Sequence, residues 1–339
     1  MSNLESFVRS VQSDSDLREF QDPVAGELED LQRSMADFFQ NSLALLQGVG
    51  SYLLGVRGKM FRPTVLLLIS KMGTSKRDDA IFAATVVELI HLATLIHDDT
   101  IDRSAVRRGL PTLNAMFNDQ VATILGDYIY TKAFCELIDR DMPRLVPVIA
   151  KTTHRMTAGE VLAIEQKRAV TLSEKDYFHL LDEKTASLMG AAARSGAILA
   201  GMDDDAVEEM TQFGENLGRA YQVTDDLFDY IGTEGQLGKG VGSDLSAGKI
   251  TLPLIHALQN VTHTSEREFL QEITKRGKFD EAEWNELLGI LRSCGALEYT
   301  RDTALGLADT AVDRLRILPE GVYRDSLEKA VAYAVQRIH

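Results

Sequence analysis

The stretch Leu95-Ile96-His97-Asp98-Asp99-Thr100-Ile101-Asp102 has the form DDxxD, which returns in Gln222-Val223-Thr224-Asp225-Asp226-Leu227-Phe228-Asp229. Each copy ends an apolar run whose spacing is typical of a helix. Residues i and i+4 share a helix face, so Asp98 lies beside Asp102 and Asp225 beside Asp229. Clustered carboxylates are costly unless cations neutralise them, and hard oxygen ligands suit Mg²⁺ shared with substrate phosphates. Two facing clusters would therefore hold a diphosphate through bridging metal.

The first motif is continuous with an apolar stripe on the same helix. Steps of three and four residues back from Asp98 reach Thr94 or Leu95, then His91, then Val87. A carboxylate rim above an apolar wall fits a substrate with an ionic head and a hydrocarbon tail. A single DDxxD is equally well explained by a solvated helix end, but two copies that both end apolar helices favour a site.

Composition excludes several classes of protein. The chain has 339 residues and a formal net charge of -15, which argues against nucleic acid as the main partner because phosphate backbones need Lys and Arg. Cys135 and Cys294 are the only cysteines, too few for a disulfide scaffold or a thiolate metal site. The start of the chain shows no signal-peptide pattern, and no uninterrupted apolar run approaches the roughly 20 residues that span a bilayer. We expect a cytoplasmic protein that does not span the membrane.

Apolar residues recur at three- and four-residue steps along most of the chain, which predicts helices rather than strands. No convincing strand pattern or solenoid repeat is present, and no low-complexity linker divides the chain. We therefore predict an all-α fold in a single domain over residues 1–339. Glycines at 48, 50, 55 and 58 are expected to end the first helical region, and loops are expected at 103–113 and 232–242. The predicted helices are 1–47, 59–69, 80–102, 114–138, one ending near 168, 173–201, 203–231 and, apart from loops near 261–264 and 318–321, 250–339. Ser173 with Asp176 resembles a capping box at the start of the helix 173–201.

Basic residues gather in or beside the predicted breaks and helix starts. Arg binds phosphate oxygens in a bidentate manner, and Lys acts as a compact point charge. Each of these residues alone is more often a surface charge, and His91 alone could be a core histidine. Together with glycine-rich loops that can approach an anion closely, they indicate a diphosphate clamp. The basic residues are Lys59, Arg62, Arg107, Arg108, Lys184, Lys239 and Lys249.

The order and spacing of these motifs from about residue 55 to 258 resemble the trans-polyprenyl diphosphate synthases. The motifs are Gly58-Lys59-x-x-Arg62-Pro63, His97-Asp98-Asp99-x-x-Asp102, Arg107-Arg108-Gly109, Gly126-Asp127-Tyr128, Gly159-Glu160, Lys184-Thr185-Ala186, Gln222-x-x-Asp225-Asp226-x-x-Asp229, Gly238-Lys239 and Gly248-Lys249-x-Thr251. The resemblance implies an isoprenoid-synthase-type helical bundle around a central cavity. It also implies head-to-tail condensation of isopentenyl diphosphate with an allylic diphosphate such as farnesyl or geranylgeranyl diphosphate. Relatives often have Gln where this chain has Ala163, which leaves that side of the site looser.

The same resemblance assigns expected roles to individual residues. It implies that Asp98, Asp102 and Asp225 ligate several Mg²⁺ ions, three being the expected number, with Asp99, Asp226 and Asp229 in or near the coordination. Arg107, Lys184 and Lys239 would hold the allylic diphosphate, and Lys59, Arg62, His91 and Arg108 the isopentenyl diphosphate. Thr185 and Gln222 would lie along the developing allylic cation, and Lys249 would close the site. Family members are usually homodimers, which we expect here too.

The residues just before the first motif bear on product length. In this family, bulky aromatic residues four and five positions before the first aspartate stop chain growth early. Here those positions hold Thr94 and Ala93, which are small. The local sequence resembles long-chain, octaprenyl-type synthases, so we expect a long all-trans product.

Three alternatives stay open at this point. A geranylgeranyl or farnesyl diphosphate synthase would share every motif and differ only in where chain growth stops. A terpene cyclase would share the all-α fold and one DDxxD, but it needs no second diphosphate site. A non-catalytic subunit of a heteromeric synthase would be expected to have degraded aspartate motifs, whereas both motifs are intact here.

Overall fold

The computed structural model describes residues 14–40, 43–55, 58–167, 169–232 and 241–336, and these ranges are almost entirely helical. The elements before the first motif are α2 (Asp14–Gln21), η1 (Asp22–Val24), α3 (Ala25–Gln40), α4 (Ala44–Gly55) and α5 (Phe61–Ser70). The first motif ends α6 (Arg77–Ile101), and α7 (Leu113–Met116), α8 (Asp119–Asp139) and α9 (Val146–Glu165) follow. Next come α10 (Glu174–Leu181), the π-helix η2 (Asp182–Ala186), α11 (Ser187–Ala200) and α12 (Asp204–Ile231). The last elements are α14 (Ser243–Ala247), α15 (Leu252–Asn260), α16 (Thr264–Arg276), α17 (Glu281–Ser293), α18 (Ala296–Arg314), η3 (Leu315–Ile317) and α19 (Val322–Gln336).

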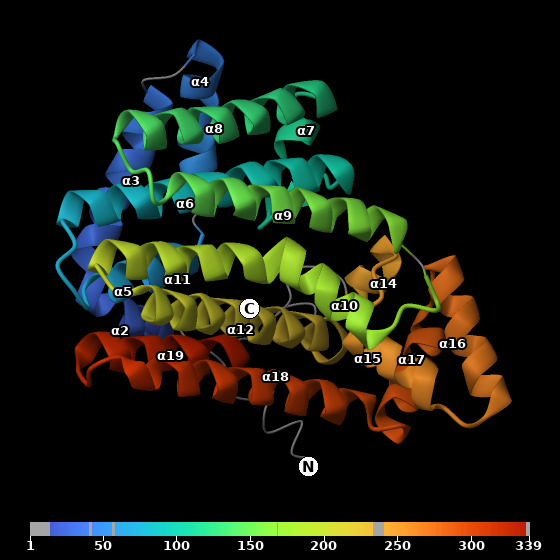
Figure 1. The fold of residues 1–339 in the computed structure, drawn as a ribbon. Coiled ribbons are helices and arrows are strands. Elements are labelled where there is room, and N and C mark those ends of the chain that lie inside the picture. The colour runs from blue at the N-terminus through green and yellow to red at the C-terminus, as the bar shows by residue number, and fades with distance from the viewer. Residues whose placement is uncertain (1–13, 41–42, 56–57, 168, 233–240, 337–339) are drawn as a thin grey trace.

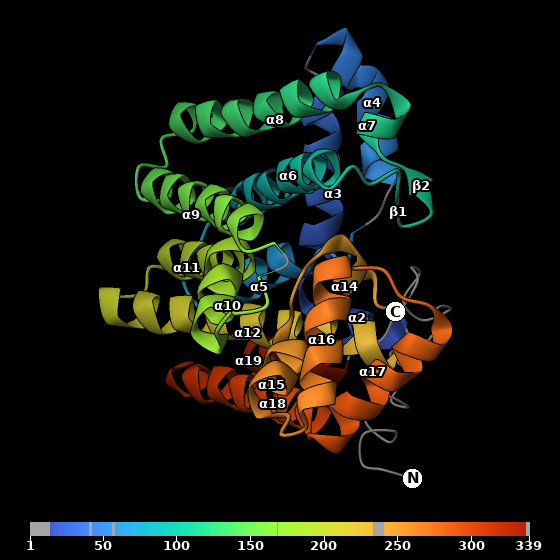
Figure 2. The same ribbon diagram turned by 90° about the vertical axis from the view of Figure 1, so that its right-hand side faces the viewer.

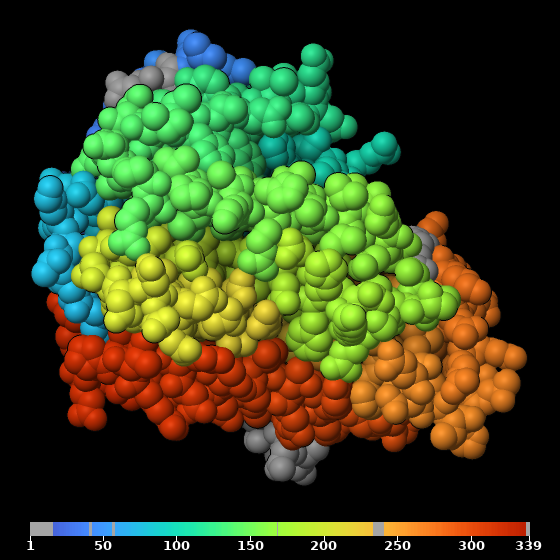
Figure 3. Space-filling model, in the orientation of Figure 1, coloured from blue at the N-terminus to red at the C-terminus, as the bar shows by residue number. Residues whose placement is uncertain are grey.

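The long helices are stacked in layers. In Figure 1, α8, α6, α9, α11, α12 and α18 run roughly parallel, and α15, α16 and α17 gather at one end beside α10. Figures 1 and 2 both place α4, α7 and α8 at the top of the molecule and α18 and α19 at the bottom. The space-filling view shows the same order as successive bands, from α8 and α9 through α11 and α12 to α18 and α19 (Figure 3). The expected all-α bundle is confirmed.

The core helix α6 explains how the first motif is held. Its residues Ala80 to Ile90 are almost all buried, while Asp98 and Asp102 sit at its carboxyl end. By length and composition α6 is the one helix of the described ranges that could cross a membrane, but 67% of its most apolar window is buried inside the protein. That burial is the pattern of a core helix in a globular protein.

Two predicted helix boundaries are wrong, the first because glycine does not end the helix there. Gly48 and Gly50 lie inside α4. A Cβ at Gly50 would lie 2.5 Å from the Cβ of Phe39, so this glycine allows α4 to approach α3 closely. The predicted helix 114–138 is also divided, because Phe117 leaves the helical region and Asn118 starts α8 by capping Val121.

The predicted loop 103–113 contains a small hairpin of β1 (Val106–Arg107) and β2 (Leu110–Pro111). Its two turn residues, Arg108 and Gly109, have φ of 51° and 76°. Positive φ at both central residues defines the type I′ turn that suits the twist of a hairpin. Strands this short give no alternating pattern, so the sequence could not reveal them.

The capping box predicted at Ser173 and Asp176 is present and starts α10. The predicted helix 173–201 is nevertheless interrupted, because η2 separates α10 from α11. The predicted loop at 232–242 falls mostly outside the described residues.

Candidate active site

A cavity of about 2290 Å³ lies between the helices, and both aspartate motifs line it. Its volume exceeds the roughly 300–1,000 Å³ of ordinary ligand pockets. Asp98, Asp99 and Asp102 reach it from α6, and Asp225 and Asp226 reach it from α12. The structure thus brings together two acidic clusters that are more than a hundred residues apart in the chain.

Both motifs lie at helix carboxyl ends, where the helix dipole disfavours negative charge. Basic side chains offset that cost at the first motif. The Arg107 Nε donates to the Oδ2 of Asp99 at 2.7 Å, and the Nζ of Lys249 lies 3.4 Å from the Oδ2 of Asp102. Burial alone would lower the pKa of Lys249, but Asp244 and Asp102 raise it. The contacts of Arg107 and Lys249 thus connect the segments that follow the two motifs with the first acidic cluster.

Lys184 lies beside both Asp98 and a carboxylate of a third helix, α9. The Nζ of Lys184 lies 3.9 Å from the Oδ2 of Asp98 and forms an ion pair with Glu160 of α9. Burial raises the pKa of Asp98 to about 7, which Lys184 opposes and Glu160 reinforces. A bound cation would therefore stabilise the charged form of this buried carboxylate more than it stabilises an exposed carboxylate.

The three aspartates of the second motif have different surroundings. Asp225 is half-buried and lines the cavity. Asp226 accepts hydrogen bonds from the Tyr177 hydroxyl at 2.7 Å and the Gln222 amide at 2.8 Å. Burial and the charge of Asp244 raise the pKa of Asp226 to about 7.

Asp229 is fully buried and is not among the residues that line the cavity. One carboxylate oxygen accepts from the Ser243 hydroxyl at 2.8 Å, and the other accepts from the backbone N–H of Asp244 at 3.0 Å. Asp229 therefore holds the start of α14. This helix contains Asp244 and is followed by Lys249, and both residues line the cavity.

A second polar group of the cavity surrounds His91. The Arg62 Nη1 lies 3.2 Å from the His91 Nε2, so the imidazole accepts from a guanidinium there. Burial lowers the pKa of His91 well below its usual value, and Arg62, Arg108 and Arg107 lower it further. Burial raises the pKa of the nearby Glu88, against the effect of Arg62 and Arg108. His91 is consequently neutral at physiological pH.

The loop before α5 brings two more cations to this group. Met60 has a φ of 50°, a left-handed conformation that is strained for a side chain of this size, and it lines the cavity with Lys59 and Arg62. The Nζ of Lys59 lies 5.1 Å from the ring centroid of Tyr333 in α19. The C-terminal helix thus forms part of the cavity wall beside the loop.

The structure gathers most of the residues singled out from the sequence, and the exceptions are informative. Ala93 is fully buried in the core, whereas its neighbour Thr94 lines the cavity. Lys239 lies outside the described residues. The expected residues that line the cavity are Lys59, Arg62, His91, Thr94, Asp98, Asp99, Asp102, Arg107, Arg108, Lys184, Thr185, Gln222, Asp225, Asp226 and Lys249.

Several lining residues were given no role from the sequence. Glu88 precedes His91 by nearly one helical turn, a spacing that could have marked it as a partner. Glu160 belongs to a quoted motif, but its pairing with Lys184 depends on tertiary structure. Tyr177 and Tyr333 had no local signal, because each contacts residues far away in the chain.

The carboxylates suit a hard divalent cation, but they do not form a closed metal site. Within the described ranges, no three His, Cys, Asp or Glu side chains are placed to hold an ion by themselves. The Oδ1 of Asp99 is buried without a hydrogen-bond partner, so it has an unused acceptor beside the cavity. Such an incomplete oxygen set fits ions whose coordination a phosphorylated ligand completes.

Comparison with known proteins matches residues 43–291 to the model of the polyprenyl synthetase family. The chain belongs to the polyprenyl synthetase family. It is a prenyltransferase, and the resemblance drawn from its motifs is confirmed.

Proteins of this family are similar to the chain over nearly its whole length. An all-trans-nonaprenyl-diphosphate synthase (geranyl-diphosphate specific) from Rhodobacter capsulatus is 33% identical over 93% of this chain and 96% of its own. The octaprenyl diphosphate synthase of Escherichia coli is 32% identical over 95% of this chain and 99% of its own. A polyprenyl synthase from Caulobacter crescentus, crystallised with calcium and isoprenyl diphosphate, has a TM-score of 0.88 at 30% identity and covers 95% of this chain and 98% of its own. Sequence and fold therefore agree on the family.

Proposed function

We propose that this prenyltransferase adds isopentenyl diphosphate repeatedly to an allylic diphosphate and releases a long all-trans polyprenyl diphosphate. The observation that carries the proposal is the single cavity that receives both aspartate motifs and two separate groups of cations. A cyclase would need only one diphosphate site. The relatives named for nonaprenyl and octaprenyl products support a long chain.

The two groups of cations suit two diphosphates. Lys184 and Arg107 stand beside the first motif, where they would hold the allylic diphosphate as its carbon–oxygen bond breaks. Arg62, His91 and Lys59, with Arg108, would hold isopentenyl diphosphate on the α5 side of the cavity. Neutral His91 can accept from Arg62, and a guanidinium is a donor group that also suits phosphate oxygens.

Thr185 and Gln222 also line the cavity, and they would face the developing allylic cation. The isopentenyl double bond would attack that cation to form the new carbon–carbon bond, and transfer of a proton to the departing diphosphate would restore a double bond. Lys249, which bridges to Asp102, would close the site against water. The role expected for Lys239, as a third cation for the allylic diphosphate, stays a prediction.

We assign Mg²⁺ to the acidic rim. Asp98 and Asp102 on one side and Asp225 on the other would ligate the ions, with Asp99 and Asp226 adjacent. Bound Mg²⁺ would stabilise the negative charge that develops on the leaving diphosphate. The relative that was crystallised with calcium and isoprenyl diphosphate supports a divalent cation at such a site. The expected number of three ions stays a prediction.

The length of the cavity supports a long product. Glu160, Met156, Thr153 and Ala150 all line it from α9. Glu160 and Ala150 are ten residues apart, which is about 15 Å along a helix. Thr94 lies on the same cavity wall as the first motif, so a growing tail would meet a small side chain there.

The test is incubation of the purified protein with Mg²⁺, farnesyl diphosphate and labelled isopentenyl diphosphate, followed by separation of the dephosphorylated products by length. We expect products well beyond geranylgeranyl, and we expect Thr94→Phe to shorten them while ionisation of the primer continues. Products that stop at geranylgeranyl in the unmodified protein would assign it to the shorter-chain synthases. No elongation with any primer would favour a subunit of a heteromeric synthase.

We also propose a homodimer formed through α8 and the elements beside it. Ile124 and Ile138 of α8 are 61% and 63% exposed and, at a spacing of fourteen residues, lie on one face of the helix. Exposed apolar residues continue onto the hairpin and the segment after it, at Val106, Leu110, Met116 and Phe117. Large exposed apolar side chains gathered on neighbouring elements are typical of an interface. The single domain over 1–339 and the cytoplasmic location remain predictions.

A further inference from the structure

The cavity receives Lys184 and Thr185 from an unusual turn. In η2 the backbone N–H of Ser187 donates to the carbonyl of Asp182, five residues earlier, instead of the carbonyl four residues earlier. The carbonyl four residues earlier is that of Glu183, and it accepts from the Ser187 hydroxyl at 2.7 Å. The π turn therefore has its own side-chain support, and such turns are rare and concentrate at functional sites.

Two glycines on different helices leave room for the turn. A Cβ at Gly159 of α9 would lie 2.7 Å from the backbone N of Lys184. A Cβ at Gly218 of α12 would lie 2.9 Å from the Cα of Ala186. The turn is thus packed backbone to backbone between α9 and α12.

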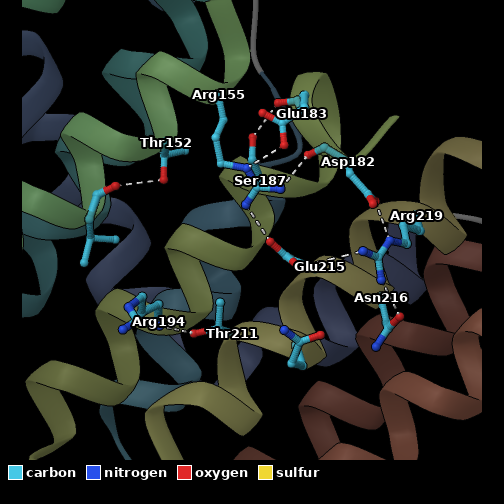
Figure 4. Close-up of polar contacts among 12 residues, drawn as sticks. Thr152, Arg155, Asp182, Glu183, Ser187, Arg194, Thr211, Glu215, Asn216 and Arg219 are labelled. Carbon is cyan, nitrogen blue, oxygen red and sulfur yellow. Dashed lines mark hydrogen bonds and ion pairs between the residues drawn. The ribbon is translucent and has the colours of Figure 1, made fainter. Parts of the chain in front are cut away.

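A ring of ion pairs closes around the same turn. Arg155 of α9 donates from Nε to Glu183 at 2.9 Å and from Nη2 to the carbonyl of Asp182 at 3.4 Å. Arg219 of α12 donates from Nε to the carboxylate of Asp182. Glu215 joins the two arginines, at 2.7 Å from Arg155 and 3.8 Å from Arg219. Figure 4 shows Arg155 and Arg219 reaching this turn from different helices with Glu215 between them.

We propose that Arg155 and Arg219 are positioning residues that fix the register of the π turn and thereby hold Lys184 and Thr185 toward the cavity. Neither arginine is among the residues that line the cavity, so neither contacts a ligand placed there. A π turn contains one residue more than the α-helical turn it replaces. Its loss would rotate α10 against α11 by about 100°, which would turn Lys184 away from Asp98. Charge-assisted hydrogen bonds to both the side chain and the carbonyl of Asp182 oppose that slip.

The test compares Arg155→Met with Arg314→Met. Arg314 of α18 pairs at 2.9 Å with Glu209 of α12, the helix that also carries Glu215. The Arg314 side chain is 38% exposed and the Arg155 side chain 34%. The inference rests on the proposed function, so the assay measures KM for the allylic primer and for isopentenyl diphosphate. It also measures affinity for a thiolo analogue of the primer that binds but does not ionise.

We expect both substitutions to lower the melting temperature by similar amounts. Only Arg155→Met should raise the primer KM and the analogue dissociation constant, each by about tenfold, while the isopentenyl diphosphate KM changes less than twofold. Arg155→Lys should restore part of the analogue affinity, and it decides the matter if the Met variant does not fold.

Unchanged analogue affinity in the Arg155 variants would overturn the inference, as would an equal loss in Arg314→Met or an equal rise in both KM values. Failure of the unmodified protein to elongate would instead refute the proposed function. Analogue binding would still report on the turn in that case, so the two failures are distinguishable.

Discussion

At the scale of single residues, similar aspartates do different work according to what surrounds them. Asp225 lines the cavity, whereas Asp229, one helical turn later, is fully buried and accepts from Ser243 and Asp244. A carboxylate whose two oxygens are occupied by loop donors is poorly placed to ligate a metal. Sequence alone had grouped both residues as potential ligands.

We therefore expect Asp229→Asn and Asp225→Asn to fail in different ways. The amide of Asp229→Asn can still accept from the Asp244 N–H and donate to a rotated Ser243 hydroxyl, but it loses the negative charge, and hydrogen bonds to a charged group are worth about 1.5–3 kcal/mol. Asp229→Asn should lower kcat/KM about tenfold or more without changing the Mg²⁺ concentration for half-maximal activity. Asp225→Asn should raise that concentration strongly. Equal shifts in Mg²⁺ dependence would show that Asp229 is a ligand after all.

His91 offers a pH test at the same scale. Its folded pKa lies below the unfolded value, so below about pH 6.5 the unfolded chain binds a proton that the folded protein refuses. Stability should consequently fall as the pH drops, by up to about 1.4 kcal/mol at one unit below the unfolded pKa. His91→Gln keeps an acceptor for Arg62 and should remove this contribution.

The measurement is the free energy of unfolding of the unmodified protein and of His91→Gln at about pH 7.5 and 5.5. Buried Glu88, whose raised pKa makes stability change with pH in the opposite direction, is present in both proteins, so its contribution cancels in the comparison. An identical pH dependence in the two proteins would contradict the assignment of a neutral His91.

At the scale of elements, close helix contacts depend on glycine at particular positions. Gly159 and Gly306 both lie inside helices, but only Gly159 faces backbone within 3 Å, whereas a Cβ at Gly306 would meet nothing within 4 Å. We expect Gly159→Ala to cost about 1–3 kcal/mol because α9 and the π turn must separate.

Gly306→Ala, the matched control, should be neutral or stabilising by up to about 1 kcal/mol, because alanine favours helix. Urea unfolding measures both changes, and prenyltransferase activity should fall only in Gly159→Ala. A stable and fully active Gly159→Ala protein would show that this contact tolerates expansion.

At the scale of the whole molecule, the proposed dimer explains why α8 presents large apolar side chains outward. Sedimentation of the unmodified protein should give twice the chain mass of 37.5 kDa. Replacing Ile124 and Ile138 together by Glu should shift it to the monomer, since charge at an interface core is strongly disfavoured.

Val322→Glu is the control, because Val322 is 55% exposed on α19, away from the proposed interface. That variant should remain dimeric. A dimer that survives the α8 substitutions would move the interface elsewhere, and a monomeric unmodified protein would refute the proposal.

The sequence by itself determined the fold class, the family and most of the cavity lining. Helical periodicity, the two DDxxD motifs and the spacing of Lys and Arg are local properties, which a linear chain displays directly. The capping box at Ser173 was predictable for the same reason. Glycines inside helices and strands of two residues were misread because their local signals are ambiguous.

Only the tertiary structure decided which residues support the site. The burial of Asp229, the pairing of Glu160 with Lys184 and the π turn between α9 and α12 each join segments distant in the chain. Arg155 is an ordinary helical arginine in the sequence, and it gains its partners only when α9 packs beside η2 and α12. Residue type fixes what a side chain can do, whereas long-range packing fixes what it meets.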